Sequence, residues 1–176
     1  MISLIHPSRG RPIKSYINAL DWSNMAGCET ELLVSIDSSD PEAEAYLKKY
    51  FPHDCIVSPN QSVVEATNNA AKHSKGDILI YLSDDFKCFP DWGKAVEEEF
   101  KKYSGPTLIK VDDCLQPFHV RVLTIPIMNR ELYNKLGYFW NPEYKSMFVD
   151  QDLFEVCLKN GWLKYAPHLK FHHEHV

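Results

Sequence analysis

The chain of 176 residues has the length of one domain and enough mass to bury a sizeable core. Apolar residues make up 44% and charged residues 24%, with a formal net charge of −5, so the composition is that of an ordinary globular protein and gives no overall electrostatic basis for nucleic-acid binding. The five cysteines are odd in number and scattered without a C-x-x-C pair, which argues against a zinc ribbon or a disulfide framework and predicts free thiols.

Membrane and export signals are not visible in the sequence. No apolar run approaches the roughly 20 residues that a membrane-spanning helix needs. The opening sequence MISLIHPSRGRP lacks the basic start, long apolar middle and small-residue cleavage site of a signal peptide. We therefore expect a cytoplasmic protein without a transmembrane segment.

The first half of the chain alternates short apolar runs with helical patterns. The apolar runs predict strands at residues 1–6, 31–37, 55–58 and 77–82. The first helical pattern places on one face Ile13, Tyr16, Ile17 and Leu20. A second helix is expected to begin with Asp40 as N-cap and Pro41 as its first residue, and a third with the capping-box pair Ser62 and Glu65.

This alternation predicts a largely parallel sheet with right-handed crossovers. In such sheets ligands bind beyond the carboxyl ends of the strands. Asp37 ends the second expected strand, and Asp84 with Asp85 end the fourth. Three carboxylates are therefore expected to gather at one rim of the sheet.

The second half of the chain has a less regular pattern. A helix at 91–103 is expected to turn inward Trp92, Val96, Phe100 and Tyr103. Strands are expected at 107–113 and 119–128, then a short helix at 129–136 that Gly137 ends. A helix at 149–160 opens with acidic residues, as its positive N-terminus favours, and Gly161 closes it. Two further segments, 162–167 and 169–175, finish the chain.

The adjacent carboxylates of Asp84 and Asp85 repel each other unless a cation or a solvated turn relieves them. A polar turn at a strand end is one explanation, because Asp is common there. The other is a metal site, since carboxylate oxygens suit Mg²⁺ or Mn²⁺ and an imidazole nitrogen suits Mn²⁺ better than Mg²⁺. The histidines near the C-terminus could supply that nitrogen.

Five segments, in order along the chain, resemble those of family 2 glycosyltransferases with the GT-A fold, which use nucleotide-diphosphate sugars. They are ISLIHPSRGRP, LLVSIDSSD, NQSVVEATNNAAKHSKGDILIYLSDDF, FVDQDLFEVCLKNGW and YAPHLKFHHEH. Each motif is weak alone, and their order makes the likeness fairly specific. The resemblance implies an α/β, Rossmann-like GT-A fold in a single domain over 1–176, with a mixed, mostly parallel central sheet flanked by helices. Residues 1–90 would form the nucleotide-sugar-binding half and residues 91–176 the acceptor and catalytic half.

The resemblance also assigns roles on the donor side. Asp37 would contact the base, Asp84 the ribose or the metal, and Asp85 the cation that bridges the two phosphates. His173 matches the metal or phosphate histidine of the family, with His175 as the second choice. The remaining donor contacts would come from three further residues, Pro7, Ser8 and Asn68.

On the acceptor side, Asp150 matches the catalytic base. A base must reach the acceptor hydroxyl and be ionised near neutral pH, and the positive end of a helix favours the ionised carboxylate. The implied reaction is hexosyl or related glycosyl transfer by a single displacement with inversion, dependent on Mn²⁺ or Mg²⁺, from a donor that is most often a UDP-sugar. Asp152 fits a structural or acceptor-binding role. The aromatic segment 139–148 could stack on the acceptor or pack in the core.

Two departures from the family pattern affect the site. Thr67 stands before Asn68 where many relatives carry Arg, and Val149 stands where the residue before the base is usually acidic. The acceptor could be a glycan, a protein, a small molecule or a modified nucleic acid, and the oligomeric state stays open.

Two alternatives share the same fold. A non-catalytic nucleotide-sugar-binding module would keep the domain without the chemistry. A nucleotidyltransferase would normally have a Gly-rich basic loop after the first strand, which HPSRGRP matches poorly. A histidine-based zinc hydrolase is rejected, because neighbouring residues of the HHEH run would point to opposite faces of a strand.

Overall fold

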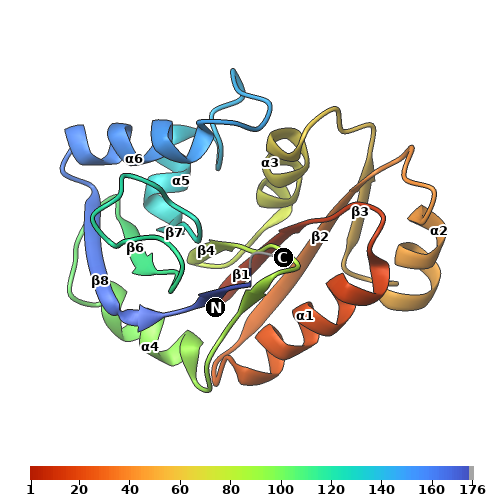
Figure 1. Ribbon diagram of the computed structural model, residues 1–176, viewed down its shortest axis with the longest axis horizontal. Helices are drawn as coiled ribbons and strands as arrows, with labels where there is room; N and C mark the ends of the chain where they lie inside the picture. The colour runs from red at the N-terminus through yellow and green to blue at the C-terminus, as the bar shows by residue number, and fades with distance from the viewer. Residues whose placement is uncertain (175–176) are drawn as a thin grey trace.

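The computed structural model describes residues 1–174 and has an α/β architecture around one mixed seven-stranded sheet (Figure 1). The strand order is β3-β2-β1-β4-β7-β6-β8, and a small second sheet pairs β5 with β9. The strands are β1 (Ile2–Pro7), β2 (Thr30–Asp37), β3 (Cys55–Ser58), β4 (Ile78–Tyr81), β5 (Phe86–Lys87), β6 (Leu108–Asp112), β7 (Ile127–Asn129), β8 (Leu163–Lys170) and β9 (His172–His173). The helices are α1 (Pro12–Met25), α2 (Ala43–Ala45), the π-helical turn η1 (Tyr46–Tyr50), α3 (Val63–His73), α4 (Trp92–Phe100), α5 (Arg130–Leu136) and α6 (Val149–Lys159).

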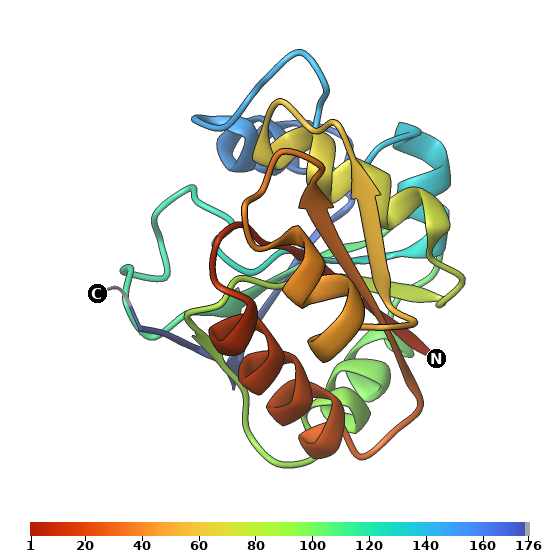
Figure 2. The ribbon, with the colours of Figure 1, turned by 90° about the vertical axis from the view of Figure 1, so that its right-hand side faces the viewer.

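The sheet is parallel at β1–β2, β1–β4, β2–β3 and β6–β8, and antiparallel only around β7. The predicted α/β class with a mixed, mostly parallel sheet is therefore confirmed. Helices α3, α5 and α6 cover one face of the sheet, and α1 and α4 cover the other (Figures 1 and 2). Each layer encloses its own apolar cluster, one centred on Trp22 and Trp92 and the other on Phe139 and Phe154.

Helix α1 packs on the sheet through a face that combines the apolar residues Ala19 and Trp22 with the polar residues Ser15 and Asn18. The apolar residues Ile13, Ile17 and Leu20 are 59%, 53% and 40% exposed. Its buried polar residues bond the neighbouring turn: Asn18 Nδ2 donates to the Ser83 carbonyl (2.8 Å), whereas the buried Asn18 Oδ1 has no partner among the described residues. Apolar periodicity indicated the helix correctly, but Ile13, Ile17 and Leu20 mark its outer face. The opposite side is buried because Trp22 packs in the apolar cluster and Asn18 bonds the β4–β5 turn.

Two expected elements differ from the structure. The strand expected at 119–128 is confined to β7 (Ile127–Asn129), and residues 119–126 form an irregular loop. The second helix does not begin at Pro41, since α2 starts at Ala43 and passes directly into η1. Asp40 is not the N-cap of α2, which is Glu42 without a side-chain cap bond; its Oδ1 accepts from the Glu42 amide (2.9 Å) in the turn that precedes the helix. The capping box of α3 is confirmed: Ser62 Oγ accepts from the Glu65 amide (3.1 Å).

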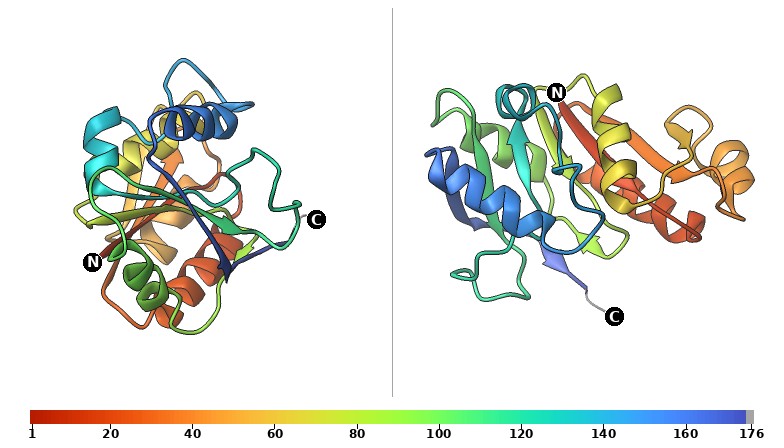
Figure 3. Two further views of the ribbon diagram at one scale, coloured as in Figure 1. Left: turned by 90° about the vertical axis from the view of Figure 1, so that its left-hand side faces the viewer. Right: turned by 90° about the horizontal axis from the view of Figure 1, so that it is seen from above.

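The Asp84–Asp85 pair lies in the turn between β4 and β5. Strand β5 pairs with β9, and the Glu174 amide donates to the Asp85 carbonyl (2.8 Å), so the end of the chain returns to this turn. The β6–β7 loop and β9 project from the same end of the molecule (Figure 3). Pairing of residues far apart in sequence thus brings His173 beside the aspartates.

No helix within residues 1–174 combines the length and the apolar character that crossing a membrane requires.

Candidate functional site

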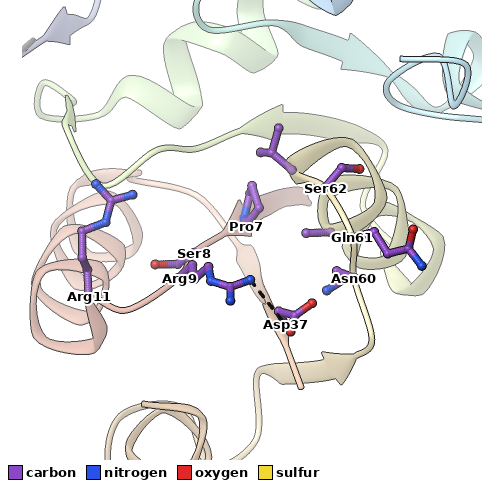
Figure 4. A pocket seen from close by; sticks show the side chains of 10 residues that line it. Pro7, Ser8, Arg9, Arg11, Asp37, Asn60, Gln61 and Ser62 are labelled. Carbon is purple, nitrogen blue, oxygen red and sulfur yellow. Dashed lines mark ion pairs between the residues drawn. The ribbon is translucent and has the colours of Figure 1, made fainter. Parts of the chain in front are cut away.

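A cavity of about 330 Å³ opens at the carboxyl ends of β1 and β2, and we call it the β1–β2 cavity (Figure 4). It is lined by Pro7, Ser8, Arg9, Arg11, Asp37, Asn60, Gln61, Ser62, Val63 and Ala66. The structure thus brings together three of the predicted donor-binding residues, Pro7, Ser8 and Asp37. The position at parallel strand ends is where α/β sheets bind ligands.

Asp37 is the carboxylate of this cavity. Its Oδ1 accepts hydrogen bonds from the Ser39 hydroxyl and from the Ser39 amide (2.6 Å), and Arg9 Nη1 lies 3.9 Å away. These hydrogen bonds, with the Arg9 charge, lower the pKa of Asp37. The carboxylate is therefore anionic at neutral pH and held as a hydrogen-bond acceptor at the cavity wall.

The loop that follows β1 is held in place by side chains from other elements. The Tyr46 hydroxyl bonds Ser8 Oγ (2.8 Å) and accepts from the Arg11 amide (2.9 Å). The Gly10 amide donates to Asp40 Oδ2 (2.7 Å), and Gly10 has φ +67°, a conformation that glycine adopts without strain. This fixed loop holds Arg9 and Arg11 at the cavity while their side chains stay 61% and 54% exposed.

Asp84 lies beneath that loop, and its side chain is fully buried. Its Oδ1 accepts from His6 Nε2 (2.8 Å) and Ser15 Oγ (2.6 Å), and Arg11 Nε lies 3.0 Å from Oδ2. Burial raises the pKa of this carboxyl, but the bond and charge of His6, the Ser15 bond and the Arg11 charge outweigh it, so the pKa of Asp84 is lowered. In this structure Asp84 is a buried anion that ties β1, α1 and the β4–β5 turn together, rather than a group facing the cavity.

Asp85 faces a different neighbour. Its Oδ2 lies 3.3 Å from His173 Nε2, with the two side chains 23% and 18% exposed. Its Oδ1 is buried and has no hydrogen-bond partner within residues 1–174. The His173 ring stands edge-on against Phe86, its partner in the β5–β9 pair, which orients the imidazole. The predicted His175 lies outside the described residues.

A second cavity, of about 630 Å³, adjoins the N-terminus of α6, and we call it the α6 cavity. Asp150 and His173 both line it, so two more of the predicted site residues lie together. Val63, in the first turn of α3, lines both cavities, which makes them neighbours. Asp150 is half-buried in the first turn of α6, where the helix dipole favours a carboxylate.

Asn68 is not brought to either cavity. Its Nδ2 donates to the Trp140 carbonyl (2.7 Å), and its Oδ1 accepts from the Phe139 and Trp140 amides (2.9 Å each). Asp152 acts similarly, since its Oδ2 accepts from Asn141 Nδ2 (3.1 Å). Both side chains thus anchor the segment between α5 and α6, which fits the structural role considered for Asp152.

Several residues of the site were not predicted from the sequence. Asn60, Gln61 and Ser62 line the β1–β2 cavity, and the N-capping position of Ser62 was the one sequence signal that placed this loop next to a helix start. His6 gave no signal, because a lone histidine within an apolar strand does not reveal a buried carboxylate partner.

Both cavities combine apolar walls with a few polar and charged groups, as small-molecule sites do. The model of glycosyl transferase family 2 matches residues 12–150. The chain therefore belongs to this family of glycosyltransferases.

Solved structures share the fold at low sequence identity. The mannosyltransferase PcManGT from Pyrobaculum calidifontis, in complex with GDP-Man and Mn²⁺, has a TM-score of 0.72 and 12% identity, and the alignment covers 98% of this chain and 56% of that one. S. aureus TarS 1–349, in complex with UDP-GlcNAc, has a TM-score of 0.72 and 15% identity, with 97% and 57% covered. The chain thus spans less than two thirds of the length of these structures, and the likeness identifies the GT-A fold. No curated protein matches the sequence closely enough to count as a relative.

Proposed function

We propose that the protein is a metal-dependent, inverting glycosyltransferase that moves a sugar from a nucleotide-diphosphate donor, with a UDP-sugar favoured, to an acceptor hydroxyl. The observation that carries this proposal is the pair of adjoining cavities that share Val63. One offers arginines and a carboxylate for a nucleotide, and the other offers Asp150 for an acceptor. A donor and an acceptor bound in the two cavities would lie close together, and transfer between two bound substrates requires such proximity.

The donor would lie in the β1–β2 cavity. Asp37, as a fixed anionic acceptor, would bond the N–H or hydroxyl groups of a nucleoside, and Pro7 and Ser8 would lie against it. Arg9 and Arg11 are exposed enough to reach the diphosphate. Asp84 would support this side indirectly, because it fixes Arg11 and the β1–α1 loop. All residues that line this cavity fall within 1–90, which supports the proposed donor-binding half.

The metal would be held by Asp85 and His173. An orphaned buried carboxylate oxygen and an imidazole nitrogen suit Mn²⁺, although within residues 1–174 no group of three or more His, Cys, Asp or Glu could surround a metal ion. The residues therefore fit a cation that takes its other ligands from the diphosphate and water. When bound, such a cation neutralises the charge that develops on the leaving diphosphate.

Asp150 would accept the proton of the acceptor hydroxyl in a single displacement at the anomeric carbon, which inverts its configuration. It lines the α6 cavity from the positive end of α6. The helix dipole favours the carboxylate at this position, and the carboxylate would take the proton as the sugar–phosphate bond breaks.

A second candidate, a nucleotide-sugar-binding module without transfer activity, is favoured by the small number of metal ligands within the described residues. Substitution of Asp150 distinguishes the two. Asp150→Asn should lower transfer or donor hydrolysis at least a hundredfold with UDP affinity unchanged. The matched control is Glu131→Gln, which removes an exposed carboxylate from the first turn of α5.

The assay measures UDP or GDP release from a panel of nucleotide sugars with Mn²⁺, and NMR of the product reports its anomeric configuration. No release from any donor by the wild type, with tight nucleotide binding, would favour the binding module. Retention of configuration would exclude the single displacement.

A further inference from the structure

The α6 cavity has a lining of unusual composition for a cleft that ends in a carboxylate. Its larger side chains are apolar or aromatic: Val63, Tyr81, Phe86, Leu115, Val122, Leu123, Trp140, Met147, Phe148 and Val149. Neutral polar groups complete it, together with Asp150 and His173. Among the described residues that line it there is no Lys or Arg. Such a surface favours an uncharged ligand, because it offers an anion no Lys or Arg side chain to pair with, while Asp150 would repel it.

Phe148 is the most exposed aromatic side chain of this lining. It is 60% exposed, and its neighbour Met147 is 72% exposed, at the lip of the cavity. Phe148 also has φ +69°, a left-handed conformation that is rare for a bulky residue. The loop that holds it rises beyond α3 and α6 (Figure 2). Exposed apolar area and a strained backbone, two residues before Asp150, indicate a feature retained for binding rather than for packing.

The rest of the aromatic segment 139–148 behaves differently. Phe139 and Trp140 are 0% and 4% exposed and belong to the core cluster between the sheet and α6. Asn68 holds their backbone, as described above. The segment therefore begins with two fixed, buried aromatic residues, and its mostly exposed remainder ends in Phe148.

The opposite wall of the cavity is the β6–β7 loop, and buried charges hold it in shape. Lys110 Nζ donates to the Val120 and Val122 carbonyls (2.6 Å each) and lies over the Phe118 ring at 5.5 Å. Asp113 accepts from the Thr124 hydroxyl and from the Gln116 amide (2.8 Å). The Lys110 ammonium is thus bound behind the wall and is not turned toward a ligand, although it lies close enough to Asp150 for their charges to interact.

We propose that the α6 cavity takes a neutral acceptor with an apolar ring face, a sugar or aryl glycoside without phosphate or carboxylate, which stacks on Phe148 and presents a hydroxyl to Asp150. This proposal rests on the proposed function, and it names the substrate class of the same site. Sugar and aryl rings offer C–H and π faces to an aromatic side chain while their hydroxyls reach polar groups. An anionic acceptor would have to be desolvated beside Asp150.

The test compares matched probes by saturation-transfer NMR and calorimetry, with UDP and Mn²⁺ present. The neutral probes are p-nitrophenyl glycosides of glucose, galactose, mannose and N-acetylglucosamine, and the anionic probe is p-nitrophenyl glucuronide. At least one neutral glycoside should bind at least tenfold more tightly than the glucuronide. Phe148→Gly should weaken it about tenfold, with UDP affinity unchanged. Because glycine tolerates φ +69°, the melting temperature should stay equal or rise, which separates a binding role from a structural one.

Phe148→Trp keeps a ring at this position and should retain binding. Leu158→Ala, which trims an exposed apolar side chain elsewhere on α6, should change nothing. Equal or tighter binding of the glucuronide, no binding of any neutral glycoside, or unchanged affinity in Phe148→Gly would each overturn the proposal. If neither UDP nor GDP binds, the proposed function fails first, so the two failures are distinguishable; if only GDP binds, GDP replaces UDP in this test.

Discussion

The same substitution should affect a different property at each of the two adjacent aspartates of the β4–β5 turn: stability at Asp84 and nucleotide binding at Asp85. Asp84→Asn should lower the free energy of unfolding strongly, whereas Asp85→Asn should lower it little and remove metal-dependent nucleotide binding. The reason is burial: Asp84 is fully buried among donors, and Asp85 is 23% exposed with one oxygen unbonded within residues 1–174.

The magnitude for Asp84 follows from its partners. His6 Nε2 and Ser15 Oγ donate to one oxygen at 2.8 and 2.6 Å, and Arg11 pairs with the other. Each hydrogen bond to a buried charge contributes about 1.5–3 kcal/mol. In Asp84→Asn the NH₂ group of the new amide would face one of these donors, so that hydrogen bond would be lost. A loss of about 3 kcal/mol is expected at pH 7, which lowers the melting temperature by roughly 6–12 °C for a chain of this size. The Asp85–His173 pair is partly exposed and should contribute at most about 1 kcal/mol.

The difference should also depend on pH. The pKa of Asp84 is lower in the folded state than in the unfolded chain, so the stability it contributes is present above the unfolded value and lost as the pH falls through the folded one. Urea unfolding of wild type and Asp84→Asn should give a constant difference from pH 5 to 7 that shrinks below about pH 4. A difference under about 1 kcal/mol at pH 7, or an equal loss in Asp85→Asn, would refute this assignment of roles.

Three further substitutions test other parts of the structure by urea unfolding and calorimetry. Asn68→Ala should lower the free energy of unfolding by about 2 kcal/mol while UDP affinity stays within twofold, because the side chain bonds a loop and does not line the cavity. A large loss of UDP affinity would instead indicate that Asn68 contacts the nucleotide. Lys110→Met should lower the free energy of unfolding by about 1–3 kcal/mol and weaken binding of the acceptor probe severalfold, while UDP binding stays intact. An equal weakening of UDP binding would contradict a role confined to the β6–β7 loop. On α1, Ile17→Gln should change the free energy of unfolding by less than about 0.5 kcal/mol, whereas Asn18→Ala should lower it by about 1–2 kcal/mol. A larger loss in Ile17→Gln than in Asn18→Ala would show that the apolar face is the buried one.

The sequence predicted the strands of the first half and the rim on which Asp37 and the aspartate pair lie, because local apolar runs and turn residues specify them. It did not predict which face of α1 is buried, since that depends on hydrogen bonds from Ser15 and Asn18 to a turn more than 60 residues away. The strand expected at 119–126 failed for a related reason: the carbonyls of this segment are bound by the side chain of Lys110 instead of by a neighbouring strand.

The same limit applies to the site. Sequence order suggested that Asp84 and Asp85 act together, yet their side chains have different partners, one beneath the β1–α1 loop and one beside β9. The pairing of β5 with β9 is nonlocal, so no local pattern could show that His173 meets Asp85 and not Asp84. The resemblance named Asp150, and the helix start that carries this residue is visible in the sequence, whereas the cavity that Asp150 lines is not.

Calorimetric titration of UDP and of GDP, each with Mn²⁺ and with EDTA, tests the central claim most directly. The wild type should bind one of the two nucleotides with Mn²⁺, and at least tenfold more weakly with EDTA. Asp85→Asn should show only the weak, metal-independent binding. Asp77→Asn, which changes an exposed carboxylate, serves as the control and should bind as the wild type does. Nucleotide binding that is equally tight in EDTA, or undiminished in Asp85→Asn, would contradict a metal-dependent donor site at Asp85 and His173.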